Sequence, residues 1–438
     1  MSSILLTNGR IIDPRSQLDI VGDLLITDDR IVALGNVESE PPGTQTIDCT
    51  GRIISPGLID IHVHFREPSS GQHEETIRTG AAAAAAGGFT TVCTMPNTTP
   101  ATDSPELIST AIQIAKSVGK CRVLPTCCAT VGRLGKELAP IAEMVRSGAI
   151  AITDDGDVVE DNAMMAEVLQ AANEVDRCFM QHCQDPNMTV GGVMHAGEVQ
   201  EELGYGPWPR EAEESIITRD LSLNKDIGSA WHAQHLSSGG SVAIIEAAQQ
   251  AGQRATGEAS PHHLLLTDDA CKTHGTMAKM NPPLRTNKDI DEIKDGIQRG
   301  VITILATDHA PHPQSTKEKP FPEASFGIVG IECALALYVK ALIEDGTIEW
   351  AQMLAMMTAN PANLIGRTDL GGLSINGKAD ITVIDPEREW IIDTSEFLSP
   401  AKNCPFNGWK VKGKAVLVIL GGKITHTCTQ KQPPVDIA

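Results

Sequence analysis

Histidines and aspartates recur at positions that directly follow short apolar runs. His62 and His64 end the run 57–64, and residues two apart in a strand face the same side, so both imidazoles can reach one point. Later apolar runs are followed by Asp154, Asp155, His182, His235 and Asp308. Imidazole and carboxylate groups together suit zinc, and two metals that share a carboxylate or hydroxide use five or six such ligands. Because these groups are costly to bury unpaired, the pattern predicts a metal-dependent hydrolytic site.

The elements that must position these groups are short strands that alternate with helices. The candidate strands are 57–64, 89–95, 121–127, 149–153, 178–182, 230–235, 253–258 and 301–307. Helical patterns lie between them, for example at 105–118, 163–175, 241–250 and 290–298. Eight such alternations predict an α/β fold of the (β/α)8 TIM-like barrel type, in which the carboxyl ends of the strands meet at one face. The histidines and aspartates are therefore expected to converge.

Both ends of the chain have a different texture, with short alternating runs separated by turns. These runs are 3–8, 10–12, 22–27 and 30–34 near the N-terminus, and 379–384, 389–392 and 415–420 near the C-terminus. They predict a small β-sandwich domain formed from both termini, residues 1–54 and 366–438, beside a barrel at 55–365.

The composition excludes several classes of partner. The 438 residues carry a net charge of −21, which argues against nucleic acid or an anionic membrane as the main partner. No stretch approaches the roughly 18 apolar residues that span a bilayer, and the N-terminus lacks the basic and apolar regions of a signal peptide. The 11 cysteines include no Cys-x-x-Cys pair and indicate reduced thiols. A cytoplasmic protein is expected.

One motif carries a family resemblance. The stretch DIHVHFREP at 60–68 resembles the N-terminal signature of the dihydroorotases, which belong to the amidohydrolase superfamily. Similar stretches follow along nearly the whole chain, namely 87–92, 95–98, 153–156, 260–267, 280–285, 306–312, 326–332 and 377–380. The resemblance implies reversible hydrolysis of the cyclic amide of (S)-dihydroorotate to N-carbamoyl-L-aspartate, a step of de novo pyrimidine biosynthesis.

The resemblance also implies a ligand set for two zinc ions. His62 and His64 would bind one ion, His182 and His235 the other, and Asp155 would bridge them, with the neighbouring Asp154 left as an alternative. Asp308 would be both a ligand and the proton shuttle that serves a metal-bridged hydroxide. Hydantoinases use a carboxylated lysine as the bridge, but this strand end has none, so TDDG at 153–156 is similar to the aspartate-bridged type.

Substrate contacts follow from the same resemblance. Arg66 continues the inward-facing row of His62 and His64 and can grip a carboxylate with paired hydrogen bonds. The other implied contacts are His64, Asn97 and His312, the side chain of Asn281, and the backbone of Phe326 and Gly327. Because the protein is acidic and the substrate is an anion, Arg66, His312 and the zinc ions are expected to offset the charge locally.

Some alternatives stay open. Gln184 stands where relatives usually carry Glu, and Leu236-Ser237-Ser238 follows His235 where relatives more often show Val-Ser-Thr. A hydantoinase or allantoinase, or a non-catalytic partner of aspartate carbamoyltransferase, are the competing functions. A homodimer and a complex with aspartate carbamoyltransferase are possible assemblies, and the segment 313–325 is either a lid or a plain surface loop.

Overall fold

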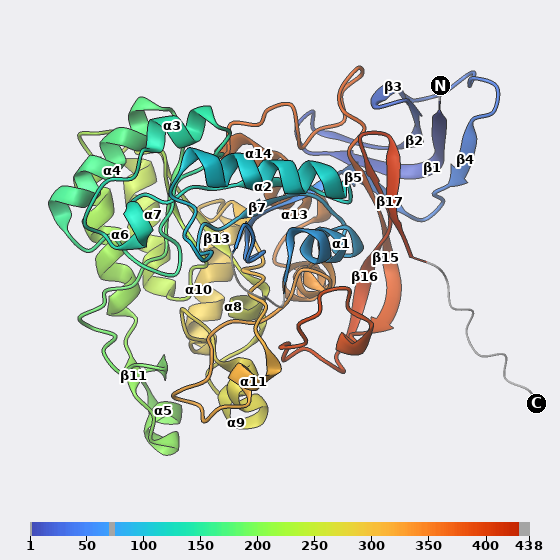
Figure 1. Ribbon diagram of the computed structural model, residues 1–438. Helices are drawn as coiled ribbons and strands as arrows, with labels where there is room; N and C mark the ends of the chain where they lie inside the picture. The colour runs from blue at the N-terminus through green and yellow to red at the C-terminus, as the bar shows by residue number, and fades with distance from the viewer. Residues whose placement is uncertain (1, 70–74, 429–438) are drawn as a thin grey trace, which may run out of the picture.

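Short parallel strands in the middle of the chain carry the site. The computed structural model describes residues 2–69 and 75–428 (Figure 1). One parallel sheet contains β6 (Leu58–Val63), β7 (Phe89–Thr94) and β8 (Arg122–Pro125). A second contains β9 (Phe179–Gln181), β12 (Trp231–Ala233), β13 (Ala255–Ala259) and β14 (Ile304–Leu305). Seven of the eight predicted strands are therefore present, most of them shorter than the apolar runs suggested.

The remaining predicted strand, 149–153, the fourth along the chain, is reduced to isolated bridges. Ile152 bridges Cys127 on one side and Phe179 on the other, which links the first sheet to the second. At the opposite gap, Val63 bridges His309. Within the described residues the pairing is therefore that of two parallel sheets joined by single bridges, where the sequence predicted one continuous eight-stranded barrel.

Helices lie between the strands, as the alternation predicted. They are α1 (Ile77–Gly87), α2 (Pro105–Val118), α3 (Ile141–Arg146), α4 (Asn162–Glu174), α5 (Glu198–Leu203), α6 (Glu211–Asn224), α7 (Gly239–Gln250), α8 (Pro261–Leu265), α9 (Ala270–His274), α10 (Asn287–Gln298), α11 (Gln314–Lys317), α12 (Ala334–Tyr338), α13 (Trp350–Met357) and α14 (Ala359–Leu364). A short parallel pair, β10 (Met194–His195) and β11 (Pro207–Trp208), flanks α5. Among residues 2–69 and 75–428, no helix has both the length and the apolar character needed to cross a membrane.

Local chemistry explains where a typical helix begins and ends. Ser104 precedes α2 and its hydroxyl accepts a hydrogen bond from the Leu107 amide at 3.4 Å, while Pro105 occupies the first helical position. Gly119 ends the helix in the left-handed region at φ 64°, which glycine adopts without a steric penalty. These signals are local, so the predicted range 105–118 coincides with α2.

The two ends of the chain meet in one sheet. Its strands are β1 (Ser3–Asp13), β2 (Leu18–Thr27), β3 (Arg30–Gly35), β4 (Gln45–Asp48), β5 (Ile53–Pro56), β15 (Ile381–Ile391), β16 (Lys410–Leu420) and β17 (Lys423–Thr427). β5 pairs antiparallel with β15, so the blue N-terminal strands and the red C-terminal strands of Figure 1 lie side by side. The predicted joining of both termini is confirmed, and the division into a separate domain at 1–54 and 366–438 stays a prediction.

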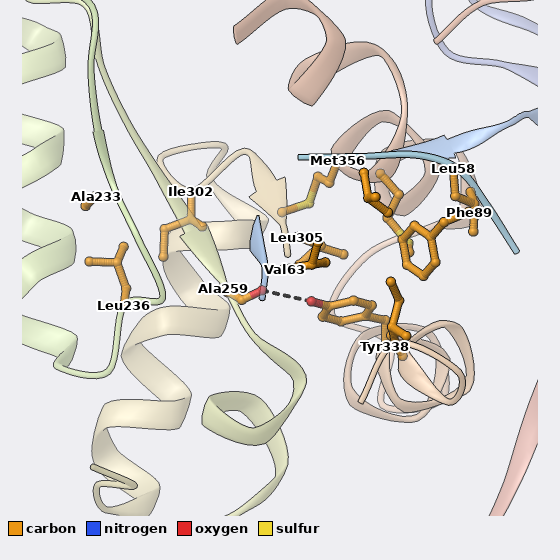
Figure 2. Close-up of a cluster of buried hydrophobic side chains, with 14 of the residues drawn as sticks. Leu58, Val63, Phe89, Ala233, Leu236, Ala259, Ile302, Leu305, Tyr338 and Met356 are labelled. Carbon is orange, nitrogen blue, oxygen red and sulfur yellow. Dashed lines mark hydrogen bonds between the residues drawn. The ribbon is translucent and has the colours of Figure 1, made fainter. Parts of the chain in front are cut away.

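Tyr338, in α12, ties this helix to two strands of the second sheet. Its side chain is fully buried, and its hydroxyl donates toward the carbonyl oxygens of Ala306 at 2.8 Å and Ala259 at 3.0 Å. Figure 2 shows the ring beside Leu305, with the hydroxyl directed at Ala259. The apolar core thus contains one polar anchor, placed where β13 and β14 lead into the site.

Replacing Tyr338 with phenylalanine is expected to lower the free energy of unfolding by about 1–3 kcal/mol. The reason is that buried carbonyl oxygens lose their donor while the ring volume is kept. Urea denaturation measures the change. Tyr205→Phe is the matched control, because the Tyr205 hydroxyl makes no hydrogen bond within the described part of the chain and its ring stacks on Phe321. Equal stability of the Tyr338→Phe variant and the wild type would show that the anchor contributes nothing.

Candidate active site

The predicted ligands converge at the carboxyl ends of the strands, and all of them are buried. Two groups have ligand atoms within 4.8 Å of one another: His62, Asp155 and His235, and His62, His64 and Asp308. The closest approaches to the acids are 3.0 Å between His64 Nε2 and Asp308 Oδ1 and 3.3 Å between His62 Nε2 and Asp155 Oδ1. Residues far apart in sequence therefore form one compact cluster that can hold a cation.

Asp155 lies at the centre of this cluster. Its Oδ1 atom is 3.3 Å from His62 Nε2, 3.6 Å from His182 Nδ1 and 3.9 Å from His235 Nε2. Its Oδ2 atom is 3.5 Å from His64 Nε2. His182 Nδ1 and His235 Nε2 are 2.9 Å apart, so both imidazoles are directed at one point. A carboxylate flanked by two imidazoles on either side is suited to bridging two metal ions.

The neighbouring Asp154 points away from the cluster. Its Oδ1 atom accepts hydrogen bonds from the backbone amides of Ala129 at 2.8 Å and Thr130 at 3.1 Å, and its Oδ2 atom accepts one from the Thr130 hydroxyl. These donors satisfy the carboxylate. Of the two adjacent aspartates, Asp155 is therefore the one that faces the histidines.

The donor set fits a metal because atoms in it lack other partners. His62 Nε2 and Asp155 Oδ1 are buried and make no hydrogen bond within the described residues, which is costly in an apolar interior. Burial alone would lower the pKa of His62, but the carboxylates of Asp155, Glu258 and Asp308 outweigh it and raise that pKa well above its usual value. For Asp155 the signs are reversed. Burial alone would raise the pKa of this carboxyl, but His62, His182 and His64 hold that pKa well below its usual range. A divalent cation would satisfy both atoms.

Two of the candidate ligands lie in strained backbone. His235 has φ 28° and Asp308 has φ 50°, both in the left-handed region that residues other than glycine rarely adopt. Such strain persists only where the surrounding structure fixes it, and it concentrates at functional sites. The backbone of the two loops that follow β12 and β14 is thus specialised to present these side chains.

Glu258, at the end of β13, is a site residue that the sequence reasoning missed. Its Oε1 atom is 2.6 Å from His62 Nδ1, and its Oε2 atom is 3.0 Å from His232 Nε2. Burial alone would raise its pKa, but His62 and His232 lower that pKa to about 2, so the carboxylate is charged. A carboxylate on one imidazole nitrogen orients the ring and leaves the other nitrogen for the metal. The signal available in the sequence was a charged residue at the last position of the predicted strand 253–258.

Glu258→Gln is expected to weaken metal binding by about 10–100-fold, because the amide orients the His62 ring less strongly and removes the charge. Competition with a chromogenic chelator measures the affinity. Glu332→Gln is the matched control. The Glu332 carboxylate accepts hydrogen bonds from the backbone amides of Leu398 at 2.9 Å and Ser399 at 3.0 Å, and in the described part of the chain it contacts none of the candidate ligand histidines. An unchanged metal affinity in Glu258→Gln would rule out the orienting role.

A pocket of about 290 Å³ opens onto the cluster. All the predicted substrate contacts line it, namely His64, Arg66, Asn97, Asn281, His312, Phe326 and Gly327. Asp155, His182, His235 and Asp308 line it as well. His62 is fully buried behind them. The structure therefore brings the candidate metal ligands and the candidate substrate contacts into one cavity.

Arg66 is the positive group of this pocket. Its Nη1 atom is 3.5 Å from Asn97 Oδ1, and its Nη2 atom donates to the Pro311 carbonyl oxygen at 3.4 Å. His312 lies in the same pocket, but burial and the nearby Arg66 lower its pKa to about 3. Burial and Arg66 thus both disfavour a charged ring at His312, and the expectation that His312 helps to offset the charge of the substrate stays a prediction. The His312 ring offers hydrogen bonds, while Arg66 carries a positive charge.

Asn281 lines the pocket, and Gln184 contacts both Asn281 and His182. Gln184 Oε1 is 3.1 Å from His182 Nε2 and accepts a hydrogen bond from Asn281 Nδ2 at 3.2 Å. The amide therefore orients the His182 ring from the position where a glutamate was expected. Asn281 Oδ1 is buried without a hydrogen-bond partner in the described ranges, so it is available to a ligand in the pocket.

Known proteins with similar sequences carry the name of the family that the motifs resemble. A family model described as dihydro-orotase-like matches residues 51–241. Proteins named dihydroorotase from Geobacter metallireducens and Ehrlichia canis are each 41% identical to this chain, with 97% of it aligned and 99% and 95% of their own lengths covered.

Solved structures show the same fold at lower identity. An L-hydantoinase (dihydropyrimidinase) from Arthrobacter aurescens has a TM-score of 0.87 at 24% identity, covering 97% of this chain and 96% of its own. A D-hydantoinase (dihydropyrimidinase) from Thermus sp. has a TM-score of 0.82 at 22% identity, covering 98% and 97%. The architecture is thus shared with these two hydantoinases, whereas the near-full-length identity is to proteins named dihydroorotase. The chain belongs to the dihydroorotase family.

Proposed function

We propose that this protein is a zinc-dependent dihydroorotase, which reversibly hydrolyses (S)-dihydroorotate to N-carbamoyl-L-aspartate in de novo pyrimidine biosynthesis. The observation that carries the proposal is the single pocket in which the histidine–aspartate cluster meets Arg66. The cluster suits hydrolysis and the guanidinium suits an acidic substrate. The near-full-length identity to proteins named dihydroorotase supports the same substrate.

The cluster has enough ligands for two zinc ions. His62 and His64 would hold one ion and His182 and His235 the other, with Asp155 shared and Asp308 as a further ligand. Bound zinc lowers the pKa of water toward neutrality and polarises a carbonyl group. A partner that had lost catalysis would have no need of a complete set, so the presence of all these ligands favours an active enzyme over a non-catalytic one.

The chain's own residues bind the ring and move the proton. Arg66 grips the substrate carboxylate, with Asn97 and His312 as further hydrogen-bonding groups. Asn281 and the backbone of Phe326 and Gly327 orient the ring. The Asp308 carboxylate accepts the proton of the attacking water and delivers it to the leaving ring nitrogen, acting first as base and then as acid.

A pair of matched substrates tests the proposal. Dihydroorotate and dihydrouracil share the cyclic amide and differ in the carboxylate that Arg66 would bind. The purified protein supplied with zinc is expected to prefer dihydroorotate in kcat/KM by at least about 100-fold, because an analogue without the carboxylate leaves buried donors unpaired. Comparable rates on both compounds would instead favour the hydantoinase or dihydropyrimidinase alternative.

Arg66→Ala is expected to raise KM for dihydroorotate by about 10–100-fold, equivalent to roughly 1.5–3 kcal/mol for charge-assisted hydrogen bonds. Steady-state kinetics with metal content measured on the same sample separates substrate binding from metal loss. Arg66→Lys keeps the positive charge but lacks the planar guanidinium group. Its KM should lie between that of the wild type and that of Arg66→Ala. Arg146→Ala is the control, because that guanidinium pairs with Glu143 at 2.7 Å on the exposed surface of α3. An unchanged KM in Arg66→Ala would refute the assignment.

The remaining expectations are also proposals. The two parallel sheets would together form a (β/α)8 barrel at 55–365, closed at the bridges of Ile152 and Val63. The 11 cysteines are all free, which supports a cytoplasmic location. A homodimer and a complex with aspartate carbamoyltransferase stay predictions.

A further inference from the structure

Two lysines are buried beside the pocket without any acidic partner. Lys279 is 1% exposed and Lys317 is 0% exposed. Neither forms an ion pair within the ranges that the structure describes, although lysine is almost never fully buried unless it is paired. A burial this costly requires strong hydrogen bonds in compensation.

All the acceptors of these two ammonium groups lie in one stretch, residues 322–327, which we name the wall segment. Lys279 Nζ donates to the carbonyl oxygens of Pro322 at 3.0 Å and Ala324 at 2.7 Å. Lys317 Nζ donates to those of Ser325 at 2.9 Å and Gly327 at 3.0 Å. The last three residues of the wall segment line the pocket. The two lysines therefore fix the backbone of the wall segment through hydrogen bonds to its carbonyl oxygens.

Further contacts fix the same stretch. The Gly327 amide donates to the Lys279 carbonyl oxygen at 2.9 Å, and Lys279 Nζ lies 4.2 Å from the centre of the Phe326 ring. Gly327 has φ 102°, and a Cβ atom there would lie 2.8 Å from Ala310 Cβ. Asn403 Nδ2 also donates to the Gly327 carbonyl oxygen at 3.1 Å. The backbone conformation of the wall segment is thus over-determined.

The consequence for the pocket lies in the amide group of Phe326. This N–H has no hydrogen-bond partner within residues 2–69 and 75–428, and it belongs to the same peptide unit as the Ser325 carbonyl that Lys317 binds. A hydrogen bond to the carbonyl of a peptide unit polarises it and strengthens its N–H as a donor. Lys317 therefore both fixes and activates this donor.

We propose that Lys279 and Lys317 are positioning residues that hold the wall segment so that the Phe326 amide donates a hydrogen bond to the ring of the substrate. The inference rests on the proposed dihydroorotase function. It also implies that residues 322–325 act as a fixed wall, because a lid opening there would break the bonds of both lysines. Burial lowers the pKa of Lys279 to about 8 and that of Lys317 to about 7. An uncharged amine keeps two N–H groups, so either protonation state can serve both carbonyls.

Paired variants of Lys317 test the inference in the zinc-loaded enzyme. Lys317→Met is one heavy atom shorter, keeps an unbranched apolar side chain and removes the donors, and it is expected to raise KM for dihydroorotate about tenfold or more. The physical reason is the loss of a pre-organised donor, worth at least one or two hydrogen bonds. Lys317→Gln keeps two donors and should recover most of that loss. Lys294→Met is the control, because that ammonium pairs with Asp345 at 2.5 Å away from the pocket.

Each outcome supports or overturns the inference. A folded Lys317→Met enzyme with the wild-type KM overturns it, and so does a Lys317→Gln enzyme as impaired as Lys317→Met. If Lys317→Met does not fold, hydrogen exchange on the wild-type protein replaces it. Peptides covering 321–329 should then exchange as slowly as those covering β13, and fast exchange overturns the inference. A wild-type enzyme without dihydroorotate turnover would overturn the proposed function itself, and with it the ligand named here.

Discussion

Replacing Asp308 with asparagine is expected to lower kcat for dihydroorotate hydrolysis by about 100- to 10,000-fold, the usual contribution of a positioned acid–base group. The amide has nearly the same shape as the carboxylate but cannot accept and return a proton. Asparagine also tolerates the left-handed backbone that this position requires at φ 50°, so the loop after β14 should keep its conformation. The loss therefore reports chemistry rather than folding.

The test measures kcat of the Asp308→Asn variant and its metal content on the same sample. Asp345→Asn is the matched control, because that side chain pairs with Lys294 at the surface and lies outside the pocket. A variant that retained its metal and turned over dihydroorotate at near the wild-type rate would refute the role of Asp308 as proton shuttle.

Replacing Asp155 with asparagine is expected to lower turnover of dihydroorotate at least as much as Asp308→Asn does, because the variant loses bound metal. Four histidines lie within 4 Å of its carboxylate, so its charge serves both halves of the cluster. Without that charge the bound metal should fall below two ions per chain, and turnover should fall about 1,000-fold or more, because water then keeps its high pKa.

The adjacent residue offers a sharp control for this prediction. Asp154→Asn makes the same carboxylate-to-amide replacement at the neighbouring position, where the carboxylate accepts hydrogen bonds from the backbone amides of Ala129 and Thr130. It should lower stability by about 1–3 kcal/mol and leave the metal in place. The reverse pattern, with metal lost from Asp154→Asn and kept by Asp155→Asn, would make Asp154 the ligand.

Much of the fold followed from local sequence signals. The range 105–118 matched α2, and α4, α7 and α10 begin within three residues of their predicted starts. Caps and the helical period are properties of neighbouring residues, so they can be read without the fold. The range 149–153 was predicted as a strand but forms only isolated bridges, because strand pairing depends on Cys127 and Phe179, which lie elsewhere in the chain.

The site was predictable where a residue lies at the carboxyl end of a strand or within three residues beyond it. His62 lies near the end of β6, and His64, His182, His235 and Asp308 follow their strands at these short distances, and they converge. The choice between Asp154 and Asp155 needed the hydrogen bonds of Ala129 and Thr130, which only the folded chain supplies.

Residues that act from behind the pocket were missed. Glu258 and His232 reach each other across neighbouring strands, and no spacing in the sequence shows this. Lys279 and Lys317 have the sequence character of surface residues, and only the backbone carbonyls around them explain their burial. The missed residues are those whose partners are backbone atoms or distant side chains.

The central claim is that the histidine–aspartate cluster binds two zinc ions that make the pocket a dihydroorotase. Its most direct test is a titration of metal-depleted protein with zinc, in which bound zinc and dihydroorotate turnover are measured on the same samples. Turnover should be absent without metal, rise with bound zinc and reach its plateau at two ions per chain. Full turnover in the metal-free protein, or no zinc bound and no turnover at any zinc concentration, would contradict the claim.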